Sequence, residues 1–292
     1  MFFQQLINGL AVGSIYALVA VGYSMVYGVL KLINFANNAF MVAGAFLIIL
    51  FVKTLSLPYW LAIVLALLAC GLGAVFMERA SLNPIRKKGS AGISALICTV
   101  GYSTVITNLL LYIFGSQTIA VPAIHNFQTV TIFGAVIDPF TLIILATALV
   151  MMLFLTWLTY GTRTGEAMRA ISQNMLATQL MGVNVNWIIT LTFFIGTVCA
   201  ALSGVMIGIY YSAVDTTMSF TIGIKTFAAA ILGGIGVLHG SLVGGLVIGL
   251  LETFVAGYIS SGYKDAIAFI VLILALIIRP TGIFGKQVHN KV

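Results

Sequence analysis

Charged side chains are scarce in this sequence, and their scarcity excludes a soluble globular protein. Only 7% of the 292 residues are Asp, Glu, Lys or Arg, whereas a soluble domain carries about 25%. Hydrophobic residues make up 61% of the chain, and several uncharged runs reach about 20 residues, the length of a helix that spans the hydrocarbon core of a bilayer. We therefore expect a polytopic membrane protein.

Cysteine and histidine are also few, and neither forms a cluster. The three cysteines lie far apart inside apolar runs, where small buried hydrophobes are expected and a disulfide framework is not. The three histidines are scattered, and no group of His, Asp and Glu side chains has the spacing of a metal or catalytic site. We therefore expect no metal, no cofactor and no enzymatic reaction centre in this chain.

The charges that are present are mostly positive, and their placement predicts the orientation in the membrane. Thirteen cationic and six acidic side chains give a net charge of +7, but the cations are spread over several loops, which the positive-inside rule explains better than a nucleic-acid partner. The loop 115–138 contains no Lys or Arg and is expected outside. An external N-terminus, a cytoplasmic C-terminus and nine crossings then place all cation clusters inside: residues 79–88, Arg163 with Arg169, and Arg279, Lys286 and Lys291 in the tail.

The apolar segments predict an all-α transmembrane bundle of eight or nine spans in one domain, 1–292. The seventh segment is short and glycine-rich and is a candidate for a broken or re-entrant helix, which is tolerated where protein or a water-filled cavity surrounds it. The external loop 115–138 alternates β-branched and polar residues, which favours a small hairpin. The expected helices cover 6–30, 36–52, 59–79, 92–114, 139–159, 186–210, 222–237, 240–260 and 265–280.

The segment 160–187 is long and polar, and it predicts an amphipathic helix over 164–182 on the cytoplasmic side. Thr164 offers an N-terminal cap, Glu166 suits the positive end of the helix dipole, and Gly182 lies where a C-terminal cap is expected. The helix either lies along the lipid headgroups or docks on a soluble partner, and both interpretations stay open. The residues that recur at three- and four-residue spacing and form one face of this helix are Ala167, Ala170, Ile171, Met175, Thr178 and Met181.

Three asparagines, Asn34, Asn37 and Asn38, lie between the first two apolar runs. Their amides supply donors and acceptors, which can satisfy backbone groups freed at a break between two helices. The favoured interpretation is capping of a helix at a cytoplasmic turn. The alternative is a polar lining of a solute pathway, for which Asn34, Asn37 and Asn38 are the candidates.

Glu252 is a carboxylate inside an apolar run, about 18 Å into its helix at 1.5 Å per residue. Intramembrane carboxylates usually face the bundle interior or a water-filled path, so Glu252 either fixes helix packing or lines a pathway. Lys225 lies near the external start of the seventh segment. We expect it to reach the membrane interface, with an ion pair to Asp215 as the less favoured alternative.

Glycines recur at four-residue spacing in the eighth segment. Small residues at this spacing allow close helix contact in lipid, so a tight seam is expected within the chain or with another subunit. The sequence Gly-Gly-Ile-Gly is not followed by Lys-Ser/Thr, which excludes a nucleotide-binding loop. The glycines of this segment are Gly240, Gly244, Gly245 and Gly249, and Gly233, Gly234 and Gly236 precede them.

Three stretches together resemble the branched-chain amino acid permeases of the LivH type. They are "NGLAVGSIYALVAVGYSMVYGVLKLINFA" near the N-terminus, "GIKTFAAAILGGIGVLHGSLVGGLVIGLLE" at 223–252 and "IIRPTGIFG" at 277–285. The segment 164–182 also resembles the coupling loop of binding-protein-dependent importers. Glu166-Ala167 and Gly182 match that loop, with Met168 where a second alanine is usual.

The resemblance implies a transport subunit, not an enzyme, in a prokaryotic plasma (inner) membrane. Expected partners are a second permease, two cytoplasmic ATPase subunits and an extracytoplasmic solute-binding protein, in addition to the lipid bilayer. Glu166, Ala167, Arg169 and Gly182 would couple the chain to the ATPases. The expected substrate is a branched-chain amino acid; urea or a short amide is the alternative, and a secondary transporter is a more distant one.

The sequence departs from the family pattern at its asparagines. Relatives typically continue Asn-Phe-Ala with His-Gly-Glu, whereas this chain has Asn37, Asn38 and Ala39. Neutral groups therefore replace a titratable histidine and a carboxylate. Gln173 and Asn174 likewise stand where relatives often carry acids.

Overall fold

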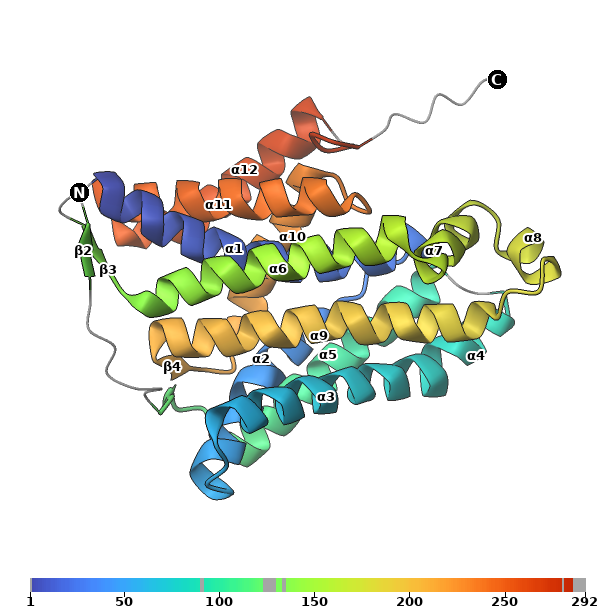
Figure 1. Ribbon diagram of the computed structural model, residues 1–292, viewed down its shortest axis with the longest axis horizontal. Coiled ribbons are helices and arrows are strands. Elements are labelled where there is room, and N and C mark those ends of the chain that lie inside the picture. Colours follow the sequence, from blue (N-terminus) through green and yellow to red (C-terminus); the bar gives the residue numbers. More distant parts are fainter. Residues whose placement is uncertain (1, 90–91, 123–129, 133–134, 280, 286–292) are drawn as a thin grey trace.

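The computed structural model is a bundle of long helices that run roughly parallel to its longest axis (Figure 1). It describes residues 2–89, 92–122, 130–132, 135–279 and 281–285; the tail cations Lys286 and Lys291 lie outside this range. Among the described residues, eight helical segments are long and apolar enough to span a bilayer, which confirms the all-α prediction. The α-helices of these segments are α1 (Phe2–Leu30), α2 (Ala36–Ile49), α3 (Tyr59–Met77), α5 (Ile93–Phe114), α6 (Pro139–Gly161), α9 (Val185–Tyr211), α11 (Leu238–Tyr258) and α12 (Lys264–Ile278).

Shorter elements extend or connect these helices. Single π-helical turns follow α2 (Leu50–Thr54) and α3 (Glu78–Leu82), and α4 (Asn83–Lys87) continues the latter. Helices α7 (Arg163–Gln173) and α8 (Met175–Leu180) lie between α6 and α9, and a 3-10 turn (Ser261–Tyr263) precedes α12. Strands β2 (Val130–Ile132) and β3 (Ala135–Ile137) form the predicted hairpin, while β1 (Ile119–Ala120) pairs with β4 (Ala213–Val214).

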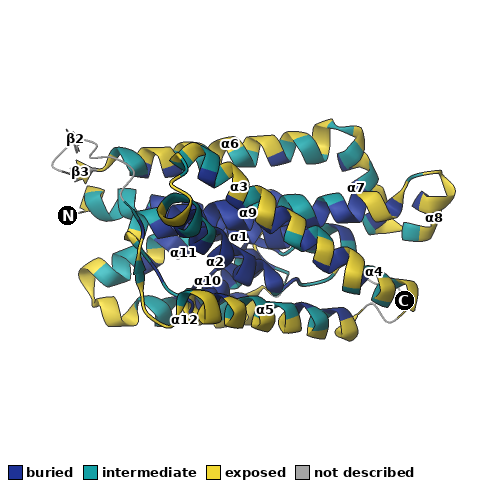
Figure 2. Cartoon of the chain, turned by 90° about the horizontal axis from the view of Figure 1, so that it is seen from below, coloured by how far each residue is buried: buried dark blue, intermediate teal, exposed yellow. Residues whose placement is uncertain are grey.

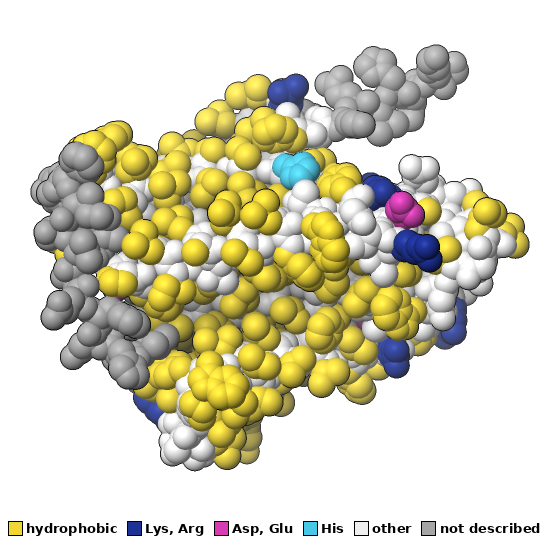
Figure 3. Space-filling model, viewed as in Figure 1, with side chains coloured by type: hydrophobic (Ala, Val, Ile, Leu, Met, Phe, Trp, Pro, Cys, Tyr) yellow, Lys and Arg dark blue, Asp and Glu magenta, His cyan; other side chains and the backbone are white. Residues whose placement is uncertain are grey.

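The core lies along α1, α2 and α9, whose residues are mostly buried, whereas α5 and α12 are mostly exposed (Figure 2). Apolar contact alone does not drive helices together in lipid. The central helices instead approach closely through small residues, as where Gly22 of α1 contacts the backbone of Gly196 in α9. Apolar side chains cover much of the face of the bundle that Figure 3 shows, as expected for a surface that faces lipid.

The seventh predicted segment is a continuous helix, α10 (Met218–Gly233), which begins and ends four residues earlier than the range 222–237. It runs antiparallel to α11, because Gly233 contacts Gly240 and Lys225 pairs with Glu252. At 1.5 Å per residue, 16 residues extend about 24 Å, slightly less than the hydrocarbon core of a bilayer. The glycines Gly234 and Gly236 form the turn to α11 with φ of 105° and 93°.

The glycine seam lies within this chain, between α11 and its neighbours α1 and α10. A Cβ on Gly245 would lie 2.5 Å from the Cα and N of Ala17 in α1. Gly249 likewise abuts Gly13, and Gly244 abuts Ala229 of α10. Gly240 packs on Gly233. The backbones of three helices therefore touch at positions where only glycine fits.

Gly245→Ala is expected to destabilise the protein, because overpacking of this kind costs about 1–3 kcal/mol. Gly101→Ala in α5 is the matched control, since nothing lies within 4 Å of the Cβ position there. Alanine at that site should be neutral or stabilise by up to ~1 kcal/mol through helix propensity. The midpoints of thermal unfolding in detergent measure both effects. Equal midpoints for the two variants would contradict the seam.

Candidate functional site

Helices α7 and α8 project from the end of the bundle opposite the β2–β3 hairpin (Figure 1). The prediction of one helix over 164–182 is wrong, because the chain breaks at Asn174, which is extended with φ −153°. The Asn174 side chain accepts a hydrogen bond from Ala177 N at 3.0 Å and caps α8. Asparagine competes with the helix for backbone groups and favours caps. The result is two short helices joined at Asn174.

The N-terminal cap of α7 also differs from the prediction. Thr162, not Thr164, accepts from Gly165 N, at 3.2 Å, and the two threonine hydroxyls are 2.7 Å apart. At the other end Gly182 has φ +83° and donates to Gln179 O at 3.0 Å, so it ends α8 as a glycine C-terminal cap does.

The residues of the predicted apolar face divide between the bundle and solvent. Ile171 and Thr178 are buried, as is Met168, whereas Ala170 and Met181 are exposed. Glu166 is exposed, and Ala167 is half-buried. The far side of α8 presents three apolar side chains to solvent: Leu176, Leu180 and Met181 are 73%, 88% and 84% exposed. We refer to these three residues as the α8 apolar patch.

Arg169 fastens α7 to the bundle. Its guanidinium donates to Thr159 O at the end of α6 and lies 5.4 Å from the centroid of the Tyr160 ring. Tyr160 in turn stacks on His239 at the start of α11, with 5.7 Å between the ring centroids. Arg169 therefore connects α7 directly to α6 and, through Tyr160, to α11.

A groove of about 650 Å³ lies between α5, α10 and the start of α2. Hydroxyl groups of α5 (Ser103, Thr104 and Thr107) share it with those at the start of α10 (Thr217, Ser219 and Thr221). None of the described residues that line it is charged. Sequence reasoning missed this groove, although the polar residues of α5 recur on one helical face.

Of the three asparagines, only Asn38 is among the described residues that line this groove. Asn34 Oδ1 accepts from Ala36 N at 3.2 Å in the turn before α2, whereas the N-cap residue of α2 is Phe35 and no side chain caps this helix. Asn37 is buried, and neither of its side-chain polar atoms has a hydrogen-bonding partner among the residues that the structure describes. Asn38 lines the groove at 8% exposure, and its side chain lies beside the buried hydroxyl of Tyr23 in α1.

Glu252 belongs to a buried ion cluster on the side of α10 turned away from the groove. Lys225 is 5% exposed, and its Nζ lies 2.7 Å from Glu252 Oε1 and 2.6 Å from Asp265 Oδ1. Tyr16 of α1 donates to Glu252 Oε2 at 2.9 Å. Lys225 is therefore buried among these side chains and does not extend into solvent, and Asp215 is not its partner but accepts from Thr217 N. The reason is that α10 begins at Met218, which places Lys225 two turns inside the helix.

A second buried carboxylate, Glu78, went unnoticed in the sequence because it adjoins the cations of 79–88. Its oxygens lie 3.3 Å from Arg86 Nη1 and 2.8 Å from Thr190 Oγ1 of α9. Arg86 also donates to Asn186 at 2.9 Å. These bonds connect the π-helical turn and α4, which follow α3, to the start of α9.

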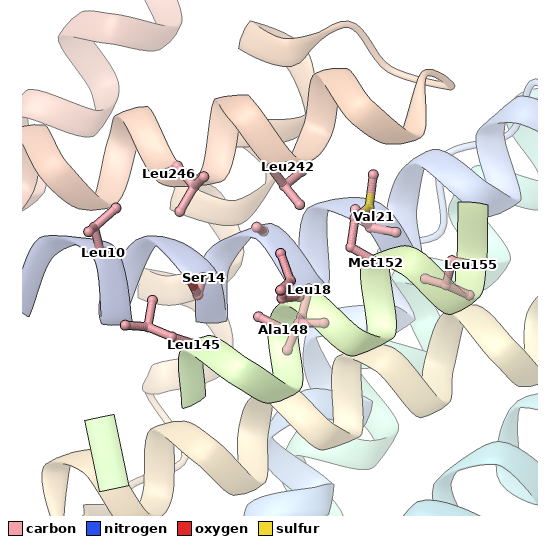
Figure 4. Close-up of a pocket in the computed structure, with 12 residues that line it drawn as sticks. Leu10, Ser14, Leu18, Val21, Leu145, Ala148, Met152, Leu155, Leu242 and Leu246 are labelled. Atoms are coloured by element: carbon pink, nitrogen blue, oxygen red, sulfur yellow. The ribbon is translucent and has the colours of Figure 1, made fainter. Parts of the chain in front are cut away.

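A further hollow of about 320 Å³ lies between α1, α6 and α11 (Figure 4). Leucines such as Leu10, Leu145 and Leu246 line it, and Ser14 is its one polar lining residue among those described. Such a lining cannot replace the hydration of a charged solute. The α5–α10 groove is therefore the better candidate for a solute pathway.

Comparison with known proteins points to one family. A family model described as "Branched-chain amino acid transport system / permease component" matches residues 5–276. The chain is 36% identical to the high-affinity branched-chain amino acid transport system permease protein LivH of Escherichia coli (strain K12), over 100% of this chain and 98% of that protein. It is also 36% identical to BraD of Pseudomonas aeruginosa, a protein of the same description, with the same coverage.

A solved structure has a similar fold. The superposition on PsaBC from Streptococcus pneumoniae in complex with Fab has a TM-score of 0.52 at 16% sequence identity, over 94% of this chain and 91% of that chain. At this identity the likeness concerns the arrangement of helices alone.

Proposed function

Because the chain belongs to the family of branched-chain amino acid transport system permease components, we propose that it is a membrane-spanning subunit of an ATP-driven importer of leucine, isoleucine and valine. The observation that carries the proposal is the 36% identity to LivH, which extends over the full chain. The chain supplies no nucleotide-binding loop, so separate ATPase subunits would provide the energy.

The α7–α8 pair is the proposed contact with an ATPase subunit. Its end of the bundle carries cations such as Arg86, Lys87 and Arg163, and Figure 3 shows Lys and Arg side chains gathered there. The positive-inside rule makes this end cytoplasmic. The N-terminus and the β2–β3 hairpin are then outside. In a complex the α8 apolar patch would form the buried centre that a stable interface needs. Arg169 would transmit movement of the ATPase subunit from α7 to the bundle. Glu166, Ala167 and Gly182 would set the position and the end of this docking element.

The α5–α10 groove is the proposed half of the solute pathway, and a second permease would cover it. Polar groups at membrane depth usually face a bundle interior or a water-filled cavity and avoid lipid. A related subunit facing the groove would enclose it and complete a path between the two sides. The solute-binding protein would then deliver its ligand at the hairpin end.

The experiment that tests the proposal is uptake into vesicles that contain the complete importer, with the binding protein outside and ATP inside. We expect leucine, isoleucine and valine to accumulate and to bind the solute-binding protein in titrations. An uncharged, hydroxyl-lined groove would also suit urea, so urea is the comparison solute. Binding and accumulation of urea in place of the amino acids would replace the proposed substrate.

A further inference from the structure

We propose that the hollow between α1, α6 and α11 binds one acyl chain of a phospholipid whose phosphate group lies against Arg169 and His239. The lipid belongs to the leaflet at the α7 end of the bundle, which the positive-inside rule makes the cytoplasmic one. The inference goes beyond the proposed function, because it assigns a lipid site and does not depend on the transported solute.

The hollow opens towards the lipid. Leu149 lines it and is 61% exposed, so the hollow reaches the outer surface of α6. Helix α6 lies on the opposite side of the bundle from α5 and α12 (Figure 2), so a second permease at the α5–α10 groove would leave it uncovered. The other large exposed side chains of α6 suit a lipid-facing surface and are Leu142, Ile143, Val150, Leu153, Phe154, Trp157 and Tyr160.

The inner wall of the hollow is closed and apolar. Ala148 and Leu155 of α6 and Leu18 and Val21 of α1 line it, and each of these side chains is at most 7% exposed. Wall atoms beside an unfilled gap lose the dispersion contacts that a neighbouring atom would provide. An acyl chain from the surrounding bilayer is flexible and apolar, so it restores these contacts without bringing a polar group into the hollow.

The hollow has the length and position of a lipid in one leaflet. It extends from Leu145 and Leu246 at one end to Leu155 and Leu242 at the other (Figure 4), and the Leu155 end is the one nearer α7. Leu145 and Tyr160 are 15 residues apart in α6, or about 22 Å at 1.5 Å per residue. One leaflet with its headgroups is about 20–22 Å thick. A chain that ends beside Leu145 therefore has its headgroup at the level of Tyr160.

The α7 end of the hollow carries donors for a phosphate group. His239 is exposed and lies three residues before Leu242, on the same face of α11. His239 and Arg169 both contact the ring of Tyr160. One of the five N–H donors of the Arg169 guanidinium is directed at Thr159 O, and no carboxylate among the described residues pairs with this cation. Arginine binds phosphate through several N–H groups at once, so a lipid phosphate suits this position.

The first test measures how tightly the hollow retains a lipid. The full-length protein is purified in detergent with the subunits that accompany it and incubated with phosphatidylglycerol, and native mass spectrometry counts the bound lipids without ATP or solute. Ala148→Phe places a ring in the hollow, and the loss of about ten non-bonded contacts should lower the affinity for one lipid about tenfold. The matched control is Ala146→Phe, the same substitution in α6 at an exposed residue that does not line the hollow, so retention should stay at the wild-type value.

The second test compares phosphatidylglycerol with diacylglycerol, which has the same chains and no phosphate. We expect the wild type to bind phosphatidylglycerol about tenfold more tightly, since hydrogen bonds to charged groups are among the stronger ones. In Arg169→Gln the ratio should fall to about threefold or less, because the cation is gone. Lys87→Gln removes an exposed cation of α4 and is the control; the ratio should not change. Glycerol 3-phosphate, which has the phosphate without the chains, should not displace the lipid at equal concentration.

Equal retention in the wild type and Ala148→Phe would overturn the site, as would an equal loss in Ala146→Phe. If Ala148→Phe does not assemble, Leu242→Trp, which narrows the α7 end of the hollow, takes its place and has the same expected loss. An unchanged ratio in Arg169→Gln, or displacement by glycerol 3-phosphate, would also overturn the proposal. Lipid retention is measured without transport, so a failure of leucine uptake would refute the proposed function and leave the lipid site in place.

Discussion

Leu180→Asp is expected to abolish ATP-driven uptake while the membrane bundle stays folded. Leu180 is 88% exposed at the outer side of α8, so the substitution disturbs no internal packing. In the assembled importer the side chain would be buried against an ATPase subunit, where an unpaired carboxylate is strongly unfavourable. Central apolar contacts of an interface often carry 2 kcal/mol or more, which is about a thirtyfold change in affinity. Uptake into vesicles and co-purification of the ATPase subunits measure the loss.

The control for this variant is Ile93→Asp, the same kind of change at a 79%-exposed residue in the first turn of α5. An acidic residue is well tolerated at a helix N-terminus, so uptake should persist. Gly182→Pro provides a second test, because proline can adopt neither the φ of +83° nor the hydrogen bond to Gln179 O. It should also uncouple ATP hydrolysis from uptake. Normal uptake in both Leu180→Asp and Gly182→Pro would refute the docking role of α7 and α8.

Lys225→Met is expected to be the most destabilising single change among the buried charges, at about 3–5 kcal/mol, the range measured when one partner of a buried ion pair is removed. Lys225 lies between Glu252 and Asp265, so its loss leaves two carboxylates close together. Glu252→Gln should be milder, because Lys225 keeps Asp265, whose side chain is half-exposed. Unfolding midpoints in detergent measure both variants.

The double variant Lys225→Met/Glu252→Gln separates a lost interaction from an uncompensated charge. Removing both buried partners is often close to neutral, so we expect the double variant to be more stable than Lys225→Met alone. Tyr16 retains a hydrogen-bonding partner in glutamine, which limits the remaining loss. A Lys225→Met protein as stable as Glu252→Gln would contradict the arrangement of the cluster.

The positions of the helices could be predicted from the sequence because hydrocarbon length sets the length of apolar runs. The expected 59–79 and 139–159, for example, correspond closely to α3 and α6. The break at Asn174 was missed because it depends on a choice between a helical hydrogen bond and a side-chain cap, which differ little in free energy. The sequence pattern of 164–182 is compatible with both.

Pairings between helices could not be predicted, since they depend on the register of one helix against another. Lys225 and Glu252 are 27 residues apart and meet because α10 and α11 pack antiparallel on either side of the turn after Gly233. The groove has the same origin: the hydroxyls of α5 form a site only when α10 lies beside them. Asn38 was a candidate from its polarity, but the packing of its carboxamide against Gly223 is visible only in the structure.

The central claim is that uptake depends on separate ATPase subunits. Leucine accumulation in vesicles tests this claim most directly. The same vesicles are prepared with both permeases and the binding protein, once with the ATPase subunits and ATP, and once without those subunits. We predict accumulation above the external concentration in the first preparation and none in the second. Uphill accumulation by the permeases alone would contradict the claim.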